Sequence, residues 1–254
     1  GSLPGGPVAR WDGNAWVIVG SNLRFSASTL NVIDFDGEGP GPERLVASRF
    51  VDPFDNWDSV AVWNGQTWAR TNCRNYHNLT LVADMDGLGP APARYYMAGA
   101  FGTIGESSGF EPVDAGSIGA FDGTVWHPLG TGSMGNQNST ELAFGEWDHD
   151  NNPATPRQVI CGSTLNVLNG DPCGTLAKLV DGHWLPIMGT RTYSAYNIEK
   201  SVMMEYDADG SGPQPPRLII GSQFEFMHQV PAVSIAQWNG TQFSAMGAGL
   251  GYTN

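Results

Sequence analysis

Short hydrophobic runs separated by tight-turn sequences dominate this chain. Runs of five to eight mostly apolar residues end at the sequences Asp-x-Asp-Gly, Gly-Pro and Asn-Gly. Such runs, bounded by turn residues, predict β-strands rather than helices. The clearest example extends over residues 202–239, where the turn at 207–213 separates two apolar runs and a third run precedes Asn239. The pattern predicts an all-β fold of many short strands.

One turn motif recurs five times. Each copy has an aromatic or apolar residue, then Asp-Gly or Asn-Gly, then a second aromatic residue two or three positions later. The glycines are separated by 52, 58, 59 and 58 residues, at Gly13, Gly65, Gly123, Gly182 and Gly240. Asp-Gly and Asn-Gly favour type I′ turns, in which both central residues have positive φ. We therefore expect five short hairpins with turns of this type.

A second motif, with two aspartates two positions apart, alternates with the hairpins. It occurs four times, and an arginine follows each copy before the next apolar run. The copies begin at Asp34, Asp84, Asp148 and Asp207, and the arginines are Arg44, Arg94, Arg157 and Arg217. Aspartate side chains stabilise turns by accepting backbone N–H groups. We expect each arginine to pair with the aspartates of its own turn, because such pairs are charge-assisted.

A period near 58 residues, with four strands in each copy, is typical of a β-propeller. We name the strands of a copy A (before the aspartates), B (after the arginine), C (before the hairpin turn) and D (after it). The chain predicts a propeller of four-stranded antiparallel blades, with four complete copies and one partial copy, hence four or five blades. The repeats run over 8–28 (strands C and D only), 29–78, 79–139, 140–197 and 198–254. Residues 1–7 are interpreted as a tag remnant and linker, and 8–254 as a single domain.

These motifs resemble the kelch and galactose-oxidase type of propeller repeat. The resemblance lies in the hairpin motif and in the small residues that end strand B, such as Gly221-Ser222. It is closer still to repeats of exported, repeat-rich proteins of environmental bacteria. The kelch double glycine is absent, and nothing in the sequence matches the copper ligands of the oxidases. The resemblance therefore implies the fold and a secreted or cell-surface location, but not the oxidase activity.

The composition excludes some partners. The net charge is −13 and the pI is near 4.5, which argues against binding to nucleic-acid phosphates or anionic membranes. No window approaches the roughly 18 apolar residues of a membrane span. Other repeats of a longer parent chain are a further kind of partner that the repeat pattern allows.

The connections B–C and D–A leave a propeller at one end and vary in length here, whereas the A–B and C–D turns are short and uniform. Binding residues concentrate on variable loops that a rigid scaffold holds. Aromatic and histidine side chains are frequent in these connections and could stack on sugar rings or peptide side chains. The candidate ligand-binding residues are Phe54, Trp57, Tyr76, His77, Phe110, Tyr193, Tyr196, Phe226 and His228. The alternative is that they form small local cores within the loops.

Acidic residues give two further hypotheses. Glu141, Glu146, Glu199 and Glu205 lie on or near strand A, which lines a propeller channel, where paired carboxylates could act as acid and base. However, Glu146 and Glu205 occupy the same repeat position, as a structural residue would. The aspartate turns offer too few oxygens for a calcium cage, so we expect no cofactor. If one turn binds calcium, the best candidates are Asp148, Asp150 and Asn152.

The three cysteines allow one disulfide. Cys161 and Cys173 flank a loop, so a secreted chain could oxidise them to a disulfide, while three reduced thiols are the alternative.

Three functions remain open from the sequence. The first is a secreted, non-enzymatic binding module that uses the loop-rich end for a carbohydrate or protein ligand. The second is a carbohydrate-active hydrolase with carboxylates in the channel. The third is a structural repeat segment of a larger cell-surface protein.

Overall fold

The computed structural model describes most of the strands and turns of the repeats. The residues described are 8–20, 22–23, 26–37, 39–48, 60–71, 73, 76–84, 92–100, 103–104, 113–114, 118–129, 142–152, 155, 157–163, 167–168, 171–172, 176–180, 183–187, 202–210, 212–222, 224–227 and 230–251. This part of the chain is all β-structure, with no helix. It accordingly contains no helix of the length and hydropathy that a membrane span requires.

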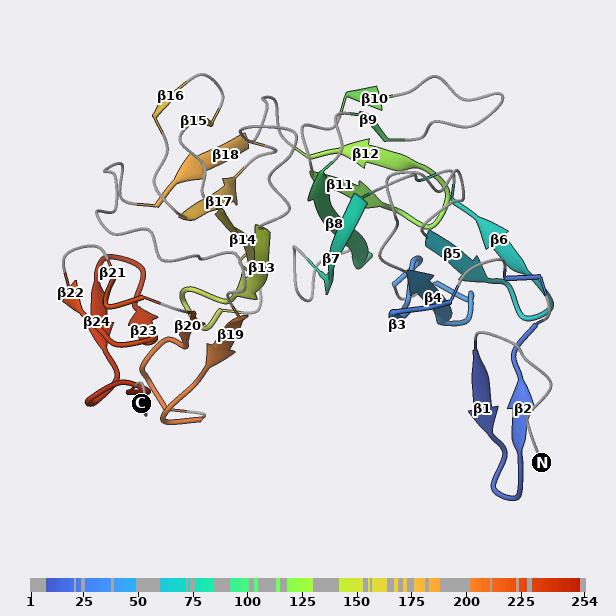
Figure 1. Ribbon diagram of the computed structural model, residues 1–254, viewed down its shortest axis with the longest axis horizontal. Coiled ribbons are helices and arrows are strands. Elements are labelled where there is room, and N and C mark those ends of the chain that lie inside the picture. Colours follow the sequence, from blue (N-terminus) through green and yellow to red (C-terminus); the bar gives the residue numbers. More distant parts are fainter. Residues whose placement is uncertain are drawn as a thin grey trace.

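Four antiparallel sheets of four strands each form the body of the molecule (Figure 1). Sheet I contains β3 (Thr29–Ile33), β4 (Arg44–Ser48), β5 (Val60–Trp63) and β6 (Trp68–Arg70). Sheet II contains β7 (Tyr76–Ala83), β8 (Arg94–Ala100), β11 (Ile118–Phe121) and β12 (Trp126–Pro128). Sheet III contains β13 (Leu142–Trp147), β14 (Gln158–Ser163), β17 (Leu176–Val180) and β18 (His183–Pro186). Sheet IV contains β19 (Val202–Tyr206), β20 (Arg217–Gly221), β23 (Ile235–Trp238) and β24 (Phe243–Ala245).

In every sheet the strands lie in the order A, B, C, D, which confirms the four-stranded antiparallel repeat. The partial copy forms a separate hairpin of β1 (Ala9–Trp11) and β2 (Trp16–Ile18). Figure 1 shows the four sheets following one another around an arc, with this hairpin beside sheet I at one end and sheet IV at the other. The A strands of sheets II, III and IV are adjacent along the arc, since β13 contacts both β7 and β19.

The hydrophobic core is divided into layers between neighbouring sheets. Successive residues of a strand point to opposite faces, and the B strands show this directly. Tyr95 and Met97 of β8 pack against sheet I, whereas Tyr96, between them, packs against sheet III. In β14, Cys161 faces sheet II and Ile160 faces sheet IV. Each inner sheet therefore buries apolar side chains on both of its faces.

Tryptophans of the D strands tie sheets I, II and III each to the unit before it. The indole Nε1–H of Trp68 donates to the carbonyl oxygen of Val19 at 2.7 Å. Trp126 donates in the same way to Thr71 at 2.9 Å, and Trp184 to Leu129 at 2.8 Å. Each acceptor lies three residues after the equivalent tryptophan of the preceding copy. The same hydrogen bond, buried in Trp126 and partly buried in Trp68 and Trp184, thus repeats at three successive junctions.

The hairpin turns differ from the predicted type I′. Gly13, Gly65, Gly123 and Gly240 have φ between 95° and 102°, but the residue before each glycine has no positive φ. In the first turn, Asp12 instead accepts the backbone N–H groups of Asn14 and Ala15 through Oδ1, at 2.9 and 2.8 Å. Asn64, Asp122 and Asn239 do the same in their own turns. The Asp or Asn is therefore needed as an acceptor, and the prediction of two positive φ values is wrong.

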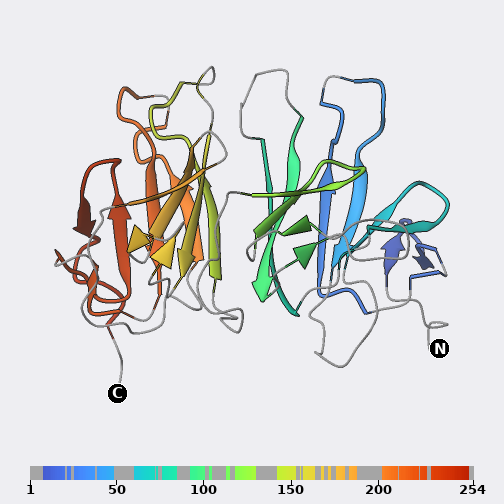
Figure 2. The ribbon, with the colours of Figure 1, turned by 90° about the horizontal axis from the view of Figure 1, so that it is seen from above.

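The aspartate turns between strands A and B confirm the expected side-chain caps. In sheet I, Asp34 Oδ1 accepts the N–H of Asp36, and Asp36 Oδ2 accepts that of Gly41 at 2.8 Å. The Asp36 carboxylate folds so closely over Gly39 that a Cβ there would clash with Oδ2. Figure 2 shows these A–B turns together along the upper edge of the molecule. This end is therefore built from short, internally hydrogen-bonded turns.

The indole hydrogen bonds give a test of how the sheets are joined. We expect Trp126→Phe to lower the free energy of unfolding by about 1–3 kcal/mol, because the carbonyl of Thr71 loses a buried donor. Trp16→Phe is the matched control, since Trp16 is 53% exposed and donates no hydrogen bond within the described residues. Denaturant unfolding of both variants measures the difference. Equal effects would contradict a role for the hydrogen bond.

Candidate functional site

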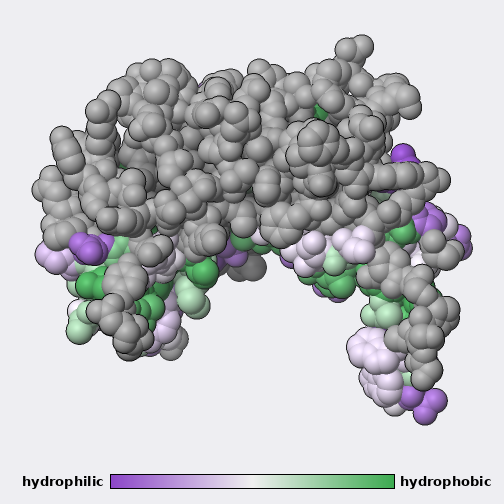
Figure 3. Space-filling view, in the orientation of Figure 1, coloured by the Kyte–Doolittle hydropathy of each residue, from purple (hydrophilic) through white to green (hydrophobic). Residues whose placement is uncertain are grey.

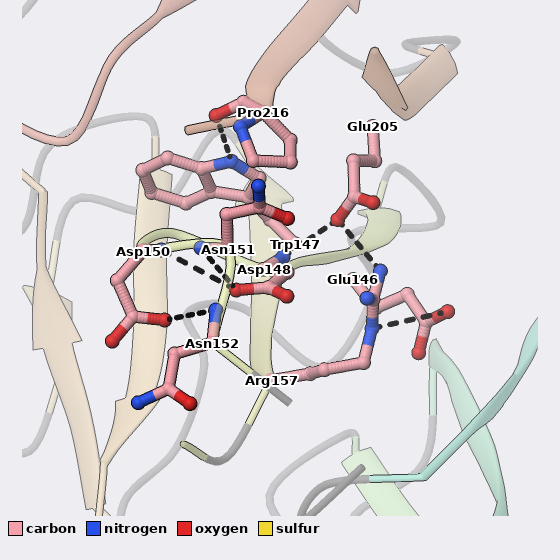
Figure 4. A network of polar contacts seen from close by, with 9 residues as sticks. All are labelled: Glu146, Trp147, Asp148, Asp150, Asn151, Asn152, Arg157, Glu205 and Pro216. Atoms are coloured by element: carbon pink, nitrogen blue, oxygen red, sulfur yellow. Dashed lines mark hydrogen bonds and ion pairs between the residues drawn. The ribbon is translucent and has the colours of Figure 1, made fainter. Parts of the chain in front are cut away.

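The junction between sheets III and IV contains a network of polar contacts (Figure 4). Trp147, at the end of β13, is 2% exposed and inserts into the core of sheet IV. Its Nε1–H donates to the carbonyl oxygen of Pro216 at 2.9 Å. This contact anchors the end of strand A, from which Glu146 and the aspartate turn extend.

Arg157 connects the two sheets through carboxylates on their A strands. Its Nη2 lies 2.6 Å from Oε2 of Glu205 in β19, and its Nε lies 3.6 Å from Oε1 of Glu146 in β13. The first contact is a short hydrogen-bonded ion pair, whereas the second is too long for a hydrogen bond. Glu205 Oε2 also accepts the backbone N–H of Asp148 at 2.6 Å. A single arginine therefore holds both strand-A glutamates.

This geometry corrects the prediction that each arginine pairs with the aspartates of its own turn. Arg157 crosses to the neighbouring sheet, because Asp148 and Asp150 already accept backbone N–H groups. Within the described part of the chain, Arg44 and Arg217 form no ion pair with their turn aspartates either. The turn before Arg94 falls mostly outside the described residues, so its pairing stays a prediction.

The two strand-A glutamates are poorly placed for acid–base chemistry. Burial raises the pKa of Glu146, while the nearby Arg157 opposes this effect. A raised pKa is what a general acid needs. Glu205, however, already uses one oxygen for both Arg157 and the N–H of Asp148. Glu141 and Glu199 lie outside the described residues.

The aspartate turn of sheet III binds its own backbone. Asp148 Oδ1 accepts the N–H groups of Asp150 and Asn151, at 3.3 and 2.9 Å, and Asp150 Oδ1 accepts that of Asn152 at 3.1 Å. Asn151 has a φ of 55° at the position where the other described turns have glycine. One oxygen of each aspartate is thus used by the backbone of its own turn. No cluster of three or more His, Cys, Asp or Glu ligands occurs among the described residues.

A small cavity of about 280 Å³ lies beside this network, between sheets III and IV. Trp147, Trp238, Pro186, Ile187 and Gly240 give it apolar walls, and His149, Gln158 and Lys178 give it polar groups. Its volume is just below the range for small-molecule pockets, roughly 300–1,000 Å³. Sequence reasoning did not find it, because its residues come from two repeats and from positions with different roles in each.

Three B–C connections carry additional two-stranded ribbons. They are β9–β10 (Thr103–Ile104 with Val113–Asp114), β15–β16 (Val167–Leu168 with Asp171–Pro172) and β21–β22 (Phe226–Met227 with Val230–Pro231). Each ribbon packs beside strand D of its own sheet. Ile104 of β9 and Met227 of β21 are 1% exposed and belong to the cores between sheets. These connections are therefore anchored to the scaffold.

Three of the candidate ligand-binding residues lie within described strands. Tyr76 and His77 begin β7, before a register irregularity that ends at Leu79, and Phe226 lies in β21. The structure thus places them on two different sheets. The other candidates, Phe54, Trp57, Phe110, Tyr193, Tyr196 and His228, lie outside the described residues.

The disulfide between Cys161 and Cys173 stays a prediction. Cys161 is fully buried in the core between sheets II and III. Cys173 lies outside the described residues.

Comparison with protein-family models, with curated proteins and with solved structures finds no match to this chain. The geometry of the chain itself is therefore the basis for a functional proposal.

A double-mutant cycle can test the contact between sheets III and IV. We expect Arg157→Leu and Glu205→Gln to show a coupling free energy of roughly 1–3 kcal/mol, because the two side chains form a direct ion pair. The control cycle joins Arg157→Leu with Asp150→Asn, and we expect a coupling near zero. Denaturant unfolding of the single and double variants supplies both values. A larger coupling free energy with Asp150 than with Glu205 would show that Arg157 pairs with its own turn instead.

Proposed function

We propose that this chain is a non-enzymatic binding module of the β-propeller type, in which sheets I to IV are the blades. The order A to D in each sheet and the burial of apolar residues between successive sheets support this assignment. The resemblance to exported repeat proteins supports a secreted or cell-surface location. That the propeller has four or five blades is also part of this proposal.

The observation that carries the binding function is the set of anchored ribbons on three consecutive sheets. The A–B turns are short and hydrogen-bonded internally, whereas the B–C connections of sheets II, III and IV extend into β9–β10, β15–β16 and β21–β22. Ile104 and Met227 fix two of these ribbons to the core. A ligand surface built on anchored ribbons loses less conformational freedom on binding than one built on free loops.

The polar network favours binding over hydrolysis. A glycosidase requires one carboxylic acid and one carboxylate that are free to meet the scissile bond. Here Arg157 forms ion pairs with both Glu146 and Glu205, and Glu205 also accepts the backbone N–H of Asp148. We therefore assign these glutamates to the connection between the blades, with no catalytic role and no cofactor.

The aromatic content of the connections favours a carbohydrate ligand. Aromatic rings present an apolar face and, in tyrosine and tryptophan, a polar edge, which together match the C–H face and the hydroxyls of a sugar ring. Tyr76 and Phe226 are the candidates that lie in described strands. We propose that they contribute to a glycan surface at the end of the molecule that carries the B–C and D–A connections.

A glycan array with the intact chain, followed by calorimetry on the best ligand, tests this function. We expect Phe226→Ala and Tyr76→Ala each to weaken binding by about five- to thirtyfold, as loss of one stacking contact of about 1–2 kcal/mol would do. Lys178→Ala, in the cavity between sheets III and IV, is the control and should bind as the unmodified chain does.

Two results would contradict the proposal. One is the absence of binding to any glycan on the array. The other is loss of binding in Lys178→Ala with full binding in Phe226→Ala and Tyr76→Ala, which would move the ligand to the cavity. Hydrolysis of the bound glycan, abolished by Glu146→Gln, would establish the hydrolase instead.

A further inference from the structure

Among the described strands, the hairpin β1–β2 has one edge without a partner. It corresponds to strands C and D, and in all four sheets strand C pairs with B on one side and D on the other. Strand β1 pairs only with β2 among the described strands. Val8 and Asp12 form backbone hydrogen bonds with Val19 and Ala15 across the hairpin. Backbone groups alternate in direction along an antiparallel strand, so those of Ala9 and Trp11 point to the open edge.

An exposed apolar shelf lies on strand A of sheet I, on the same side as this hairpin. Leu30 of β3 pairs with Ala47 of β4, and Ala47 pairs with Ala61 of β5. The three side chains therefore lie on the same face of sheet I. The hairpin segment covers the outer part of this face, because Val8 and Leu23 pack with Ala47 and Ala61 in one cluster. On strand A, however, Leu30 and Val32 remain 51% and 56% exposed. We call Leu30 and Val32 the β3 shelf.

The other sheets show what normally covers this shelf. Met203 of β19 occupies the repeat position of Leu30, four residues before the first aspartate of the turn. It is only 8% exposed, because it packs against Gly145 of β13, strand A of the preceding sheet. The β3 shelf is the place where strand A of a preceding sheet would lie. In Figure 3, hydrophobic residues are visible on the two arms that flank the open side of the arc, which is consistent with uncovered sheet faces there.

We propose that the edge of β1 and the β3 shelf together bind a β-hairpin of the A–B type, supplied by a partner polypeptide. The second strand of the hairpin would pair with the backbone of Ala9 and Trp11. Its first strand would place small or aliphatic side chains on Leu30 and Val32. This is strand addition to an open sheet edge, combined with the packing between sheets that the rest of the molecule uses.

The dimensions of the site favour two strands over a single strand or a complete four-stranded sheet. A single strand added to β1 reaches about 4.8 Å from it, which is the position of strand B and leaves the β3 shelf uncovered. A complete four-stranded sheet, such as sheet IV of a second copy, would collide with β1 and β2, which already occupy positions C and D. Two strands would fill the A and B positions beside β1, which no described strand occupies.

The hairpin β19–β20 of this chain provides a probe with the required pattern. Val202, Met204 and Ile219 lie on the face that points away from sheet III, and in the proposed complex this face meets the β3 shelf. The probe is residues 202–221 as a cyclised peptide, added to the full chain. In register with sheet IV, its Leu218 would lie opposite Trp11 and its Ile220 opposite Ala9.

We expect saturable binding by calorimetry and slower hydrogen exchange at the amides of Ala9 and Trp11. Val32→Lys and Ala9→Pro should each weaken binding by at least about tenfold, because they place a charge on the shelf and remove an edge donor. Leu185→Lys, at a leucine in strand D of sheet III that is 44% exposed, should leave binding unchanged. A peptide with Met204→Ser and Ile219→Ser should also bind at least about tenfold more weakly.

Melting temperatures within a few degrees of the unmodified chain establish that the variants fold. The proposal is overturned if the cyclised peptide does not bind, if Val32→Lys and Leu185→Lys bind it equally, or if the new protection falls outside β1 and β3. Equal binding of the serine-substituted peptide would overturn the contact with the shelf.

Discussion

Each four-stranded sheet in this chain carries apolar side chains on both faces, so a sheet can bury its surface only against its neighbours. Tyr95, Tyr96 and Met97 of β8 illustrate this, since alternate residues enter different core layers. A repeat that cannot bury its own hydrophobic faces depends on stacking for its stability. The junctions between sheets, rather than the individual sheets, therefore determine the stability of the molecule and the surfaces that remain open for binding.

Polar contacts at the junctions set how neighbouring sheets are aligned. The indole of Trp126 reaches a carbonyl of the preceding sheet, and Trp147 reaches one of the following sheet. Arg157 adds an ion pair between sheets III and IV. Apolar packing between flat sheets is largely non-directional, whereas these hydrogen bonds have defined geometry. Together they hold the strands so that the ribbons of neighbouring sheets have fixed relative positions.

The sequence allowed the strands, their order and the aspartate caps to be predicted, because these depend on local turn chemistry. The contact of Arg157 with Glu205 could not be predicted in the same way, since it depends on which sheet lies next to which. A signal was present: glutamate precedes the aspartates by two positions only in the third and fourth repeats, which are the two that Arg157 connects. The hairpin turns were misjudged because Asp12 and its equivalents act as acceptors. The ribbons were missed because Ile104 and Met227 lie within connections whose sequences vary.

Native-state hydrogen exchange measures the dependence of each sheet on its neighbours most directly. If stacking supplies the stability, the amides of β8 and β14, in sheets covered on both faces, should exchange most slowly. Those of β20, whose sheet packs against another described sheet on one face only, should be less protected, and those of β1 the least. Equal protection of β1, β8, β14 and β20 would contradict the account, because it would mean that each unit is stable without its neighbours.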